Sequence, residues 1–496
     1  MSPDESRVPV VLSTGQTVER HAPVSALELA ARAGRQCLDG APGVAALIQL
    51  VSVVDIMSEA PPAPAAALAR RLGLEPARTE VTTVGGNSPQ WLVTRAAAAV
   101  AAGELQGALV VGAEAQRSAK LHGANRAPSP HPDEGGVPGG DPGPDPVVGD
   151  DRSGVGGAEL SVGLVAPVHV YALFESVIAR RAGHTPAQHR AALGALLAPF
   201  TEVAAKHPVA WFPEVRSATE LATVTADNRI VAEPYPKRMC AFFHVDQGAA
   251  VLVTSLAAAR AAGLAERAVF CWSGAEATDV WFPVARPDLG SSPGLAAAVS
   301  AATAAAQLGV DDIDAFDLYS CFPVAVEMAV EALGIPGHDS RGLTVTGGLP
   351  YFGGPGSTYS LHAIATMVDR LRERGGTGLV SALGWYATKH AVGIYGTAPP
   401  VRGWRRGDTE EAQRAIDASA LPVATGARGR AVVVASTVAV SPDGAVSAAP
   451  VIARLTDGRQ IAAAAAPGEL AALAGRNLVG EVVDVSGEPP RYRIVA

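Results

Sequence analysis

Residues 85–115 read "GGNSPQWLVTRAAAAVAAGELQGALVVGAEA", and this stretch decides how the fold is interpreted. The β-branched run VTTV, residues 81–84, precedes the two glycines, and a small polar loop follows them. β-Branched residues favour strands, and glycine permits a tight turn. We therefore predict a strand, a glycine elbow, an alanine-rich helix that begins near Asn87, and a second buried strand.

A second stretch repeats this arrangement later in the chain. Residues 353–385 read "GGPGSTYSLHAIATMVDRLRERGGTGLVSALGW". Each copy has two glycines, a small polar loop, about four turns of helix, a break with glycine and an apolar strand. The repeat predicts a duplicated α/β protein whose two glycine loops face one site. Chance similarity between ordinary α/β units is the alternative.

Length and composition exclude several classes of protein. The chain has 496 residues, sufficient for roughly two to four domains, and 48% of them are apolar, which excludes a mostly disordered protein. A net charge of -9 argues against nucleic acid or an anionic membrane as the main partner. The sequence has no run of ~18 apolar residues that would span a membrane. Its N-terminus lacks an apolar signal segment, so we expect a cytoplasmic location.

The four cysteines, Cys37, Cys240, Cys271 and Cys321, are widely separated. They form no CxxC pair and no Cys/His spacing typical of zinc sites. We therefore expect neither a disulfide framework nor a metal site, which suits a reducing compartment.

Strand-like and helical segments alternate over most of the chain, which predicts a layered α/β protein. We place a first half at residues 1–255, a second half at 256–402 and a small β-rich domain at 403–496. The first half contains a segment rich in Gly, Pro and Asp, residues 123–157. We expect a solvated surface loop there, with a lid over a ligand site as the alternative.

The C-terminal segment has short strands separated by the turns PDG, residues 442–444, and TDG, residues 456–458. With one short helix among them, these strands predict a five-stranded barrel of the oligonucleotide/oligosaccharide-binding type. The segment lacks the basic and aromatic surface that single-stranded nucleic acid requires. Packing or contact with a partner is therefore its expected role.

Four stretches place reactive or glycine-rich residues at predicted strand ends. They are "GGNSPQ" (85–90), "DLYSCFP" (317–323), "GGLPYFGGPGSTYSLHAIA" (347–365) and "SALGWYATKHAVGIYGT" (381–397). Together with "GALVVGAEA" (107–115) and "VDQGAAVLVTS" (245–255), their order and spacing resemble the thiolase superfamily. The resemblance is greatest to a thiolase-like actinobacterial branch described as acetyl-CoA acetyltransferases, which carries an additional C-terminal domain. It covers most of residues 24–400 and the tail only loosely.

The resemblance implies a five-layered α/β/α/β/α core built from two βαβαβαββ halves. It also implies an acyl-CoA ligand, with the thioester carbonyl held where the strand-end loops of both halves converge. A coenzyme A thioester is therefore the expected substrate or ligand, with no covalently bound cofactor. The superfamily usually dimerises through a strand near the first loop, and the sequence leaves a homodimer or a partner protein open.

Thiolases attack the thioester with a cysteine at the N-terminus of a buried helix, where the helix dipole stabilises the thiolate. The resemblance places that position at residues 85–87, and no thiol is present there. Ser88 is the nearest hydroxyl and a weak candidate, because no base lies near it in the sequence. The structural alternative is that Asn87 or Ser88 caps the helix, with Pro89 in its first turn. Gly85, Gly86 and Asn87 are instead predicted to bind substrate.

The second thiolase element falls at Tyr319-Ser320-Cys321-Phe322. Sterol-carrier-linked thiolases also have a cysteine before this phenylalanine, so the resemblance gives Cys321 an acid/base role. With a depressed pKa it would become the nucleophile, and Tyr319 is a further catalytic candidate. A small buried core cysteine is an equally good interpretation.

The third and fourth elements depart from the thiolase pattern. Gly354 occupies the position of the usual histidine, and we predict that Gly354 and Gly356 offer backbone N–H groups to an oxyanion or a phosphate. Gly384 ends a loop without titrating side chains and is predicted to bind substrate. In the "TKH" motif that follows, His390 is a catalytic candidate, against a structural hydrogen-bonding role.

The usual Cys/His/Cys chemistry is thus absent, and thiolysis through an elbow cysteine is not expected. One hypothesis is an acyltransferase or carbon–carbon bond-forming enzyme of lipid metabolism that uses Cys321 with His390. The second is an inactive acyl-CoA-binding scaffold that works with a partner subunit. The third is a retro-aldol-type lyase acting on CoA esters.

Overall fold

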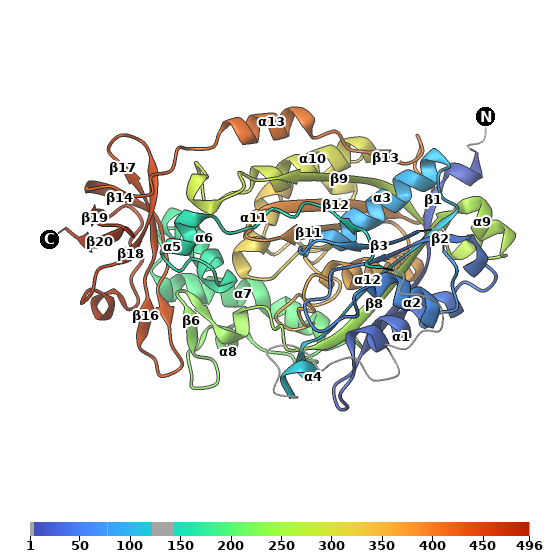
Figure 1. The fold of residues 1–496 in the computed structure, drawn as a ribbon, viewed down its shortest axis with the longest axis horizontal. Coiled ribbons are helices and arrows are strands. Elements are labelled where there is room, and N and C mark those ends of the chain that lie inside the picture. The colour runs from blue at the N-terminus through green and yellow to red at the C-terminus, as the bar shows by residue number, and fades with distance from the viewer. Residues whose placement is uncertain (1–3, 77, 122–142, 496) are drawn as a thin grey trace.

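The computed structural model describes residues 4–76, 78–121 and 143–495. A large α/β body carries the N-terminus at one end, and a small barrel carries the C-terminus at the other (Figure 1). The segment rich in Gly, Pro and Asp spans residues 123–157. Its part up to residue 142 lies outside the described residues, and residues 143–157 are described.

One mixed sheet of eleven strands runs through the α/β body. Strands of the first half are β1 (Pro9–Val18), β2 (Ile48–Val53), β3 (Arg78–Thr82), β4 (Gly107–Ala115), β5 (Val147–Val148) and β8 (Asp246–Ser255). Those of the second half are β9 (Val269–Thr278), β10 (Ala315–Asp317), β11 (Thr377–Gly384) and β12 (Lys389–Gly396), and β13 (Arg405–Arg406) pairs with β9.

The sheet confirms the predicted duplication. The first half has the order β1-β8-β4-β2-β3, and the second half repeats it as β9-β12-β11-β10. The directions also agree, because β1/β8 and β9/β12 are antiparallel whereas β4/β2 and β11/β10 are parallel. The two halves join edge to edge where β1 pairs with β9.

Helices on and between the two half-sheets complete five layers. The central helices α3 (Ser88–Ala102) and α12 (Tyr359–Arg374) contact strands of both halves. Outer helices are α1 (Ala26–Asp39) and α2 (Pro64–Arg71) on the first half, and α10 (Pro293–Ala306) and α11 (Pro323–Leu333) on the second. Because both faces of α3 and α12 are covered, their side chains are mostly buried, as expected of a central layer.

The remaining helices lie at the ends of the body. A helical region within the first half, between β5 and β8 in the chain, contains α5 (Gly157–Ser161), α6 (Pro167–Arg181), α7 (Pro186–Ala204) and α8 (Ala218–Ala222). Short helices α4 (Gln116–Leu121) and α9 (Leu256–Ala261) follow strands β4 and β8. None of the described helices has both the length and the apolar character needed to cross a bilayer.

The described end of the segment rich in Gly, Pro and Asp is attached to the sheet. Strand β5 pairs in parallel with β3, and the Val81 N–H donates to the Pro146 carbonyl at 3.0 Å. The Asp145 carboxylate accepts hydrogen bonds from the Ala65 N–H and the Thr79 hydroxyl, each at 2.7 Å. This part is therefore anchored by a two-residue edge strand and by a carboxylate that caps α2, while most other residues of 143–157 are irregular and exposed or partly exposed.

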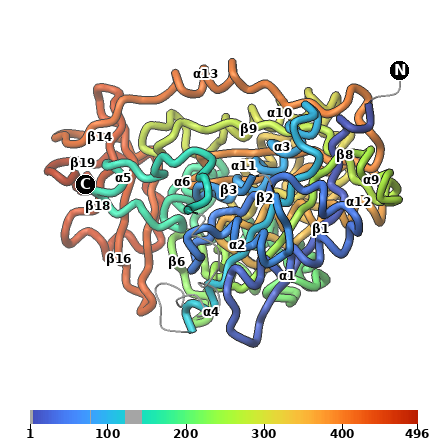
Figure 2. The backbone as a smooth tube through the Cα atoms, turned by 45° about the vertical axis from the view of Figure 1, so that its right-hand side comes forward, coloured from blue at the N-terminus to red at the C-terminus, as the bar shows by residue number. Residues whose placement is uncertain are grey.

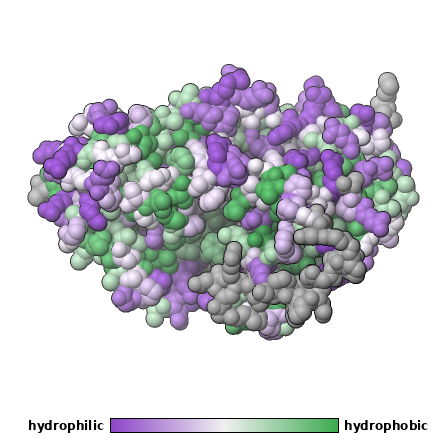
Figure 3. Space-filling view, in the orientation of Figure 1, coloured by the Kyte–Doolittle hydropathy of each residue, from purple (hydrophilic) through white to green (hydrophobic). Residues whose placement is uncertain are grey.

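The C-terminal strands form the predicted barrel. β14 (Gly429–Ser436), β17 (Val451–Leu455), β18 (Gln460–Ala465), β20 (Arg491–Ile494) and β19 (Val482–Ser486) close in that order. Numbered along the chain, the order is 1-2-3-5-4, and one short helical turn, Leu470–Leu473, separates the third strand from the fourth. Before the barrel, α13 (Glu410–Ala418) lies against β9 and exposes mostly polar side chains, seen along the upper edge in Figure 3.

The barrel is docked on the helical region (Figure 2). β15 (Ala439–Val440) and β16 (Val446–Ala448) form a four-stranded sheet with β6 (Ile230–Ala232) and β7 (Tyr235–Pro236). Ser176 of α6 accepts from the Ser436 N–H at 3.0 Å and, through its carbonyl, from the Asn477 amide at 2.7 Å. Packing against the body is thus one role of the barrel.

Candidate active site

The elbow after β3 is hydrogen-bonded directly to the matching loop of the second half. The Gly85 N–H donates to the Ser357 hydroxyl at 3.0 Å, and the Ser360 hydroxyl donates to the Gly86 carbonyl at 2.7 Å. The glycine loops of the two repeats therefore face one another, as the duplicated sequence predicts.

Gly86 is the point at which two further strand ends reach the elbow. A Cβ atom at Gly86 would lie 2.2 Å from the Tyr319 hydroxyl and 2.5 Å from the Leu383 carbonyl oxygen. Such distances are far inside van der Waals contact, so only glycine fits without a shift of the surrounding backbone. The loops after β3, β10 and β11 thus converge within a few ångströms.

The start of α3 differs in part from the prediction. Asn87 is the N-cap residue, but its side chain makes no capping hydrogen bond, and its buried Oδ1 has no hydrogen-bond partner among the described residues. The Ser88 hydroxyl donates to the Thr83 carbonyl at 3.2 Å and does not cap the helix either. Pro89 lies in the first turn as expected. Since a carbonyl is not a general base, this contact does not activate Ser88 as a nucleophile.

Two backbone donors remain at the elbow. Within the part of the chain that the structure describes, the N–H groups of Gly86 and Asn87 donate no hydrogen bond. They lie directly before α3, whose dipole favours negative charge at this end. This arrangement can hold a carbonyl oxygen that gains negative charge.

Lys389 is a residue of the site that sequence reasoning missed. Its Nζ donates to the Val84 carbonyl at 2.8 Å and to the Asp150 carbonyl at 3.5 Å, and a Cβ at Gly85 would lie 2.9 Å from it. Burial lowers the pKa of the ammonium below its ordinary value, while the nearby Asp150 and Asp55 carboxylates oppose that shift. The "TKH" motif contained the signal, but strand alternation had to decide which of its side chains faces the elbow.

His390 points to a different set of partners from Lys389. Its Nε2 lies 2.9 Å from the Asp279 carboxylate and 3.0 Å from the Ser292 hydroxyl. Ser292 and Asp279 accept from the N–H groups of Leu295 and Gly294 at the start of α10. Burial raises the pKa of Asp279, but the hydrogen bond and charge of His390 outweigh it, and the net pKa is lowered. These contacts hold the ring in place, and His390 and Asp279 also line the groove beside the elbow, so a catalytic role for His390 stays a prediction.

Cys321 lies in a buried environment that keeps its thiol protonated. Burial raises the pKa of the Cys321 thiol to about 12, whereas a hydrogen bond with Tyr171 opposes that rise. A nucleophilic cysteine needs a depressed pKa. Among the described residues no hydrogen bond joins Cys321 to His390, so the predicted pair is not assembled. The structure supports the buried core cysteine.

Tyr319 presents a neutral phenol to the elbow. Burial raises the pKa of its hydroxyl, and the neighbouring Cys321 adds to the rise. Its backbone N–H donates to the Ser381 hydroxyl at 3.0 Å, which fixes the residue against β11. A neutral phenol can donate a hydrogen bond, and this one fills the space beside Gly86.

The remaining predicted glycines have structural roles. The Gly354 N–H donates to the Phe242 carbonyl at 2.9 Å, and the Gly356 N–H donates to the Gly354 carbonyl at 2.8 Å. Both donors are engaged within the chain, so their binding of an oxyanion or a phosphate stays a prediction that these contacts do not support. A Cβ at Gly384 would lie 2.3 Å from Asn87 Oδ1. The absence of a side chain at Gly384 therefore leaves room for the asparagine at the elbow.

An open groove of about 840 Å³ adjoins the elbow. Asn87, Ser88 and Lys389 line one side, and Asp150 and Arg152 from the end of the predicted loop line another. The Arg152 guanidinium lies 3.6 Å from the ring centroid of Trp281. The described end of the segment therefore contributes side chains to the lining of this groove.

A duplicated five-layered core, with converging strand-end loops and an elbow without a thiol, defines a thiolase-like protein. No protein-family model matches the chain, and no curated protein matches it in sequence. A solved structure does match: the monomeric SCP2-thiolase like protein type 1 (STLP1) from Mycobacterium smegmatis, with a TM-score of 0.84, 32% identity and 99% of both chains covered. The chain belongs to the family of SCP2-thiolase-like proteins.

A second structure, the Ltp2-ChsH2(DUF35) aldolase, is similar in fold alone. It has a TM-score of 0.58 and 20% identity, over 78% of this chain and 97% of that chain. The finer assignment to an acetyl-CoA acetyltransferase branch stays a prediction.

Proposed function

We propose that the protein binds a coenzyme A thioester at the elbow and acts on its acyl group without forming an acyl-cysteine. One observation carries this proposal: the elbow at residues 85–87, where the resemblance to thiolases places their cysteine, has no thiol, and the Tyr319 hydroxyl fills the space beside Gly86. The thioester oxygen would accept from the Gly86 and Asn87 N–H groups and from the Tyr319 hydroxyl.

This donor set suits chemistry at the carbon next to the thioester carbonyl. Making or breaking a carbon–carbon bond there places negative charge on the carbonyl oxygen as an enolate forms. Fixed donors stabilise such charge by several kcal/mol when they are already oriented in a water-poor site. The proposed reaction class is therefore retro-aldol or aldol chemistry on a CoA ester, with acyl transfer as the less supported alternative.

A non-catalytic acyl-CoA-binding protein is the second candidate function. It is favoured by the protonated, buried thiol of Cys321 and by the engaged side chain of His390. One fold neighbour is an aldolase in which Ltp2 is joined with ChsH2(DUF35), so a partner protein remains part of this proposal.

We further propose that the chain is a monomer. β5 occupies the outer edge of β3, which is the strand near the first elbow. β5 pairs with Val81 and Thr82 of β3, and a two-residue strand at the edge of a sheet offers little backbone for a strand from a second copy. The related STLP1 structure is described as monomeric, in agreement with this proposal.

The test combines binding, turnover and intact mass on the purified full chain. Titration with acyl-CoA should show saturable binding, and a β-hydroxyacyl-CoA should be split into a carbonyl compound and a shorter acyl-CoA. The intact mass should stay unchanged after incubation, and Cys321→Ala should retain turnover. An acyl adduct that disappears in Cys321→Ala would contradict the non-covalent proposal.

A further inference from the structure

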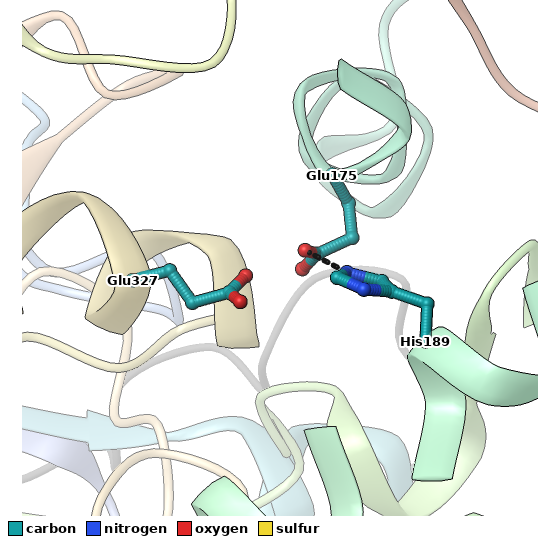
Figure 4. A group of neighbouring side chains, drawn as sticks. All are labelled: Glu175, His189 and Glu327. Atoms are coloured by element: carbon teal, nitrogen blue, oxygen red, sulfur yellow. Dashed lines mark hydrogen bonds and ion pairs between the residues drawn. The ribbon is translucent and has the colours of Figure 1, made fainter. Parts of the chain in front are cut away.

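Three side chains able to bind a metal meet in the helical region, apart from the elbow. Glu175 lies on α6, His189 on α7 and Glu327 on α11. One ligand atom from each lies within 4.8 Å of the others. Figure 4 shows both carboxylates and the imidazole ring pointing toward one another from their helices.

The hydrogen bonds around this cluster orient its ligand atoms. His189 Nε2 lies 2.6 Å from Glu175 Oε1, and the Tyr235 hydroxyl donates to Glu175 Oε2 at 2.6 Å. His189 Nδ1 lies 3.3 Å from His184 Nδ1. A histidine ligand typically bonds through its second nitrogen to a neighbouring polar group, which fixes the tautomer and the ring. His184 and Tyr235 have the positions of such outer partners.

A second observation points to a ligand rather than to an ordinary ion pair. The Glu327 Oε2 atom is buried and has no hydrogen-bond partner among the described residues, although the side chain points at Glu175 and His189. Glu175 and His189 are 0% and 2% exposed. Two adjacent buried carboxylates repel one another, and in the described chain no lysine or arginine forms an ion pair with either. Burial raises the pKa of both carboxyls.

We propose that Glu175, His189 and Glu327 form a site for one divalent transition-metal ion, with Zn²⁺ the best match. Two carboxylate oxygens and one imidazole nitrogen suit zinc, and such a set leaves a fourth position for water. Tetrahedral ligands around zinc lie about 3.4 Å apart, so small side-chain shifts would complete the geometry.

The ion would join helices that are far apart in the sequence. Glu175 and His189 belong to the helical region, whereas Glu327 belongs to the helix that follows Tyr319 and Cys321. The site would therefore hold α11 against α6 and α7. Binding to the folded state alone stabilises that state by mass action, so added Zn²⁺ should raise the melting temperature.

The test uses the full chain after removal of metals with a chelator. Calorimetric titration should show one Zn²⁺ per chain, and Co²⁺ should give a visible absorption spectrum typical of nitrogen and oxygen ligands. Glu327→Gln should weaken binding at least about 100-fold, and Tyr235→Phe about 10-fold, since it removes an outer partner. His169→Gln, on α6 outside the cluster, is the control and should bind normally.

Three results would overturn the site. Stripped wild-type protein that binds neither Zn²⁺ nor Co²⁺ would contradict the site. Unchanged affinity in Glu327→Gln would place any bound metal elsewhere, as would a thiolate-to-cobalt absorption band. Circular dichroism identifies variants that fail to fold, and the wild-type titration decides the question without them.

Discussion

Gly86 lies where three strand-end loops meet, and its missing side chain makes that contact possible. Replacing it with alanine would place a Cβ 2.2 Å from the Tyr319 hydroxyl and displace either the elbow or the phenol. We expect Gly86→Ala to weaken acyl-CoA binding or turnover by about 100-fold, as expected for a misplacement of about 1 Å.

Titration calorimetry with acyl-CoA checks this expectation. Gly157→Ala is the matched control, because a Cβ at Gly157 would contact nothing within 4 Å. Full binding and turnover in Gly86→Ala would remove the elbow from the site.

Lys389 places a buried cation beside the elbow, and its removal should affect the reaction more than the fold. We expect Lys389→Met to lower kcat/KM by about 10- to 100-fold, the effect of losing a hydrogen bond from a charged donor. Steady-state kinetics with the best CoA ester measures this loss. The control is Lys206→Met on an exposed lysine, and equal activity in the two variants would contradict a site role for Lys389.

Sequence analysis predicts that the TKH motif lies at the site, but it selects His390 as the candidate, whereas the structure places the Lys389 side chain beside the elbow. Lys389 and His390 are neighbours, and only the pairing of β12 with β9 and β11 determines which of them faces α3. A histidine is the more common catalytic group, so residue type favoured His390. Similarly, no sequence pattern indicates that Cys321 is desolvated, because its surroundings come from distant segments.

At the scale of elements, the edge strand β5 should decide the oligomeric state. Asp145 anchors its start through the Thr79 hydroxyl and the N–H of Ala65. We expect size-exclusion chromatography with light scattering to give a mass of 50.3 kDa, that of a monomer, for the wild-type protein over a wide concentration range. A stable wild-type dimer would contradict the proposal.

Loosening β5 should expose the edge of β3 and promote association. Asp145→Ala removes the anchor and should give concentration-dependent association in the same measurement. Asp151→Ala, on an exposed residue nearby, should remain monomeric. Identical behaviour of the two variants would show that β5 does not protect the edge.

Periodic elements could be predicted from the sequence, and irregular ones could not. α3, α12 and the five barrel strands were predictable because strand alternation, helix length and glycine turns agree with one another. β5 has two residues in a segment rich in proline and aspartate, and pairing with β3 alone makes it a strand. The proposed metal ligands lie on three helices, so no Cys/His spacing in the sequence could reveal them.

For the whole molecule, His362 in the central layer should link stability to pH. It is 0% exposed, its Nδ1 lies 2.8 Å from Gln16 Oε1, and its ring packs against Phe352. Burial, with a smaller effect of His207, lowers its pKa to about 3. His362 is therefore a packing residue of the central layer.

The sign of the effect follows from the proton balance. An unfolded histidine binds a proton below about pH 6.5, whereas folded His362 stays neutral until about pH 3. The free energy of unfolding should therefore decrease as the pH is lowered from about 6.5 to about 3, by about 1.4 kcal/mol per pH unit. Urea unfolding between pH 6 and 4 measures the slope of the unfolding free energy against pH. In His362→Gln this slope should be smaller than in the wild type by about that amount. An unchanged slope would contradict the buried neutral state.

The central claim is that a CoA thioester binds with its carbonyl oxygen at the elbow. A crystal structure of the protein with a non-hydrolysable acyl-CoA analogue tests it most directly. We expect the carbonyl oxygen within hydrogen-bond distance of the Gly86 or Asn87 N–H and the Tyr319 hydroxyl, with no covalent bond to Cys321. An acyl group bound elsewhere, or a covalent bond to Cys321, would contradict the claim.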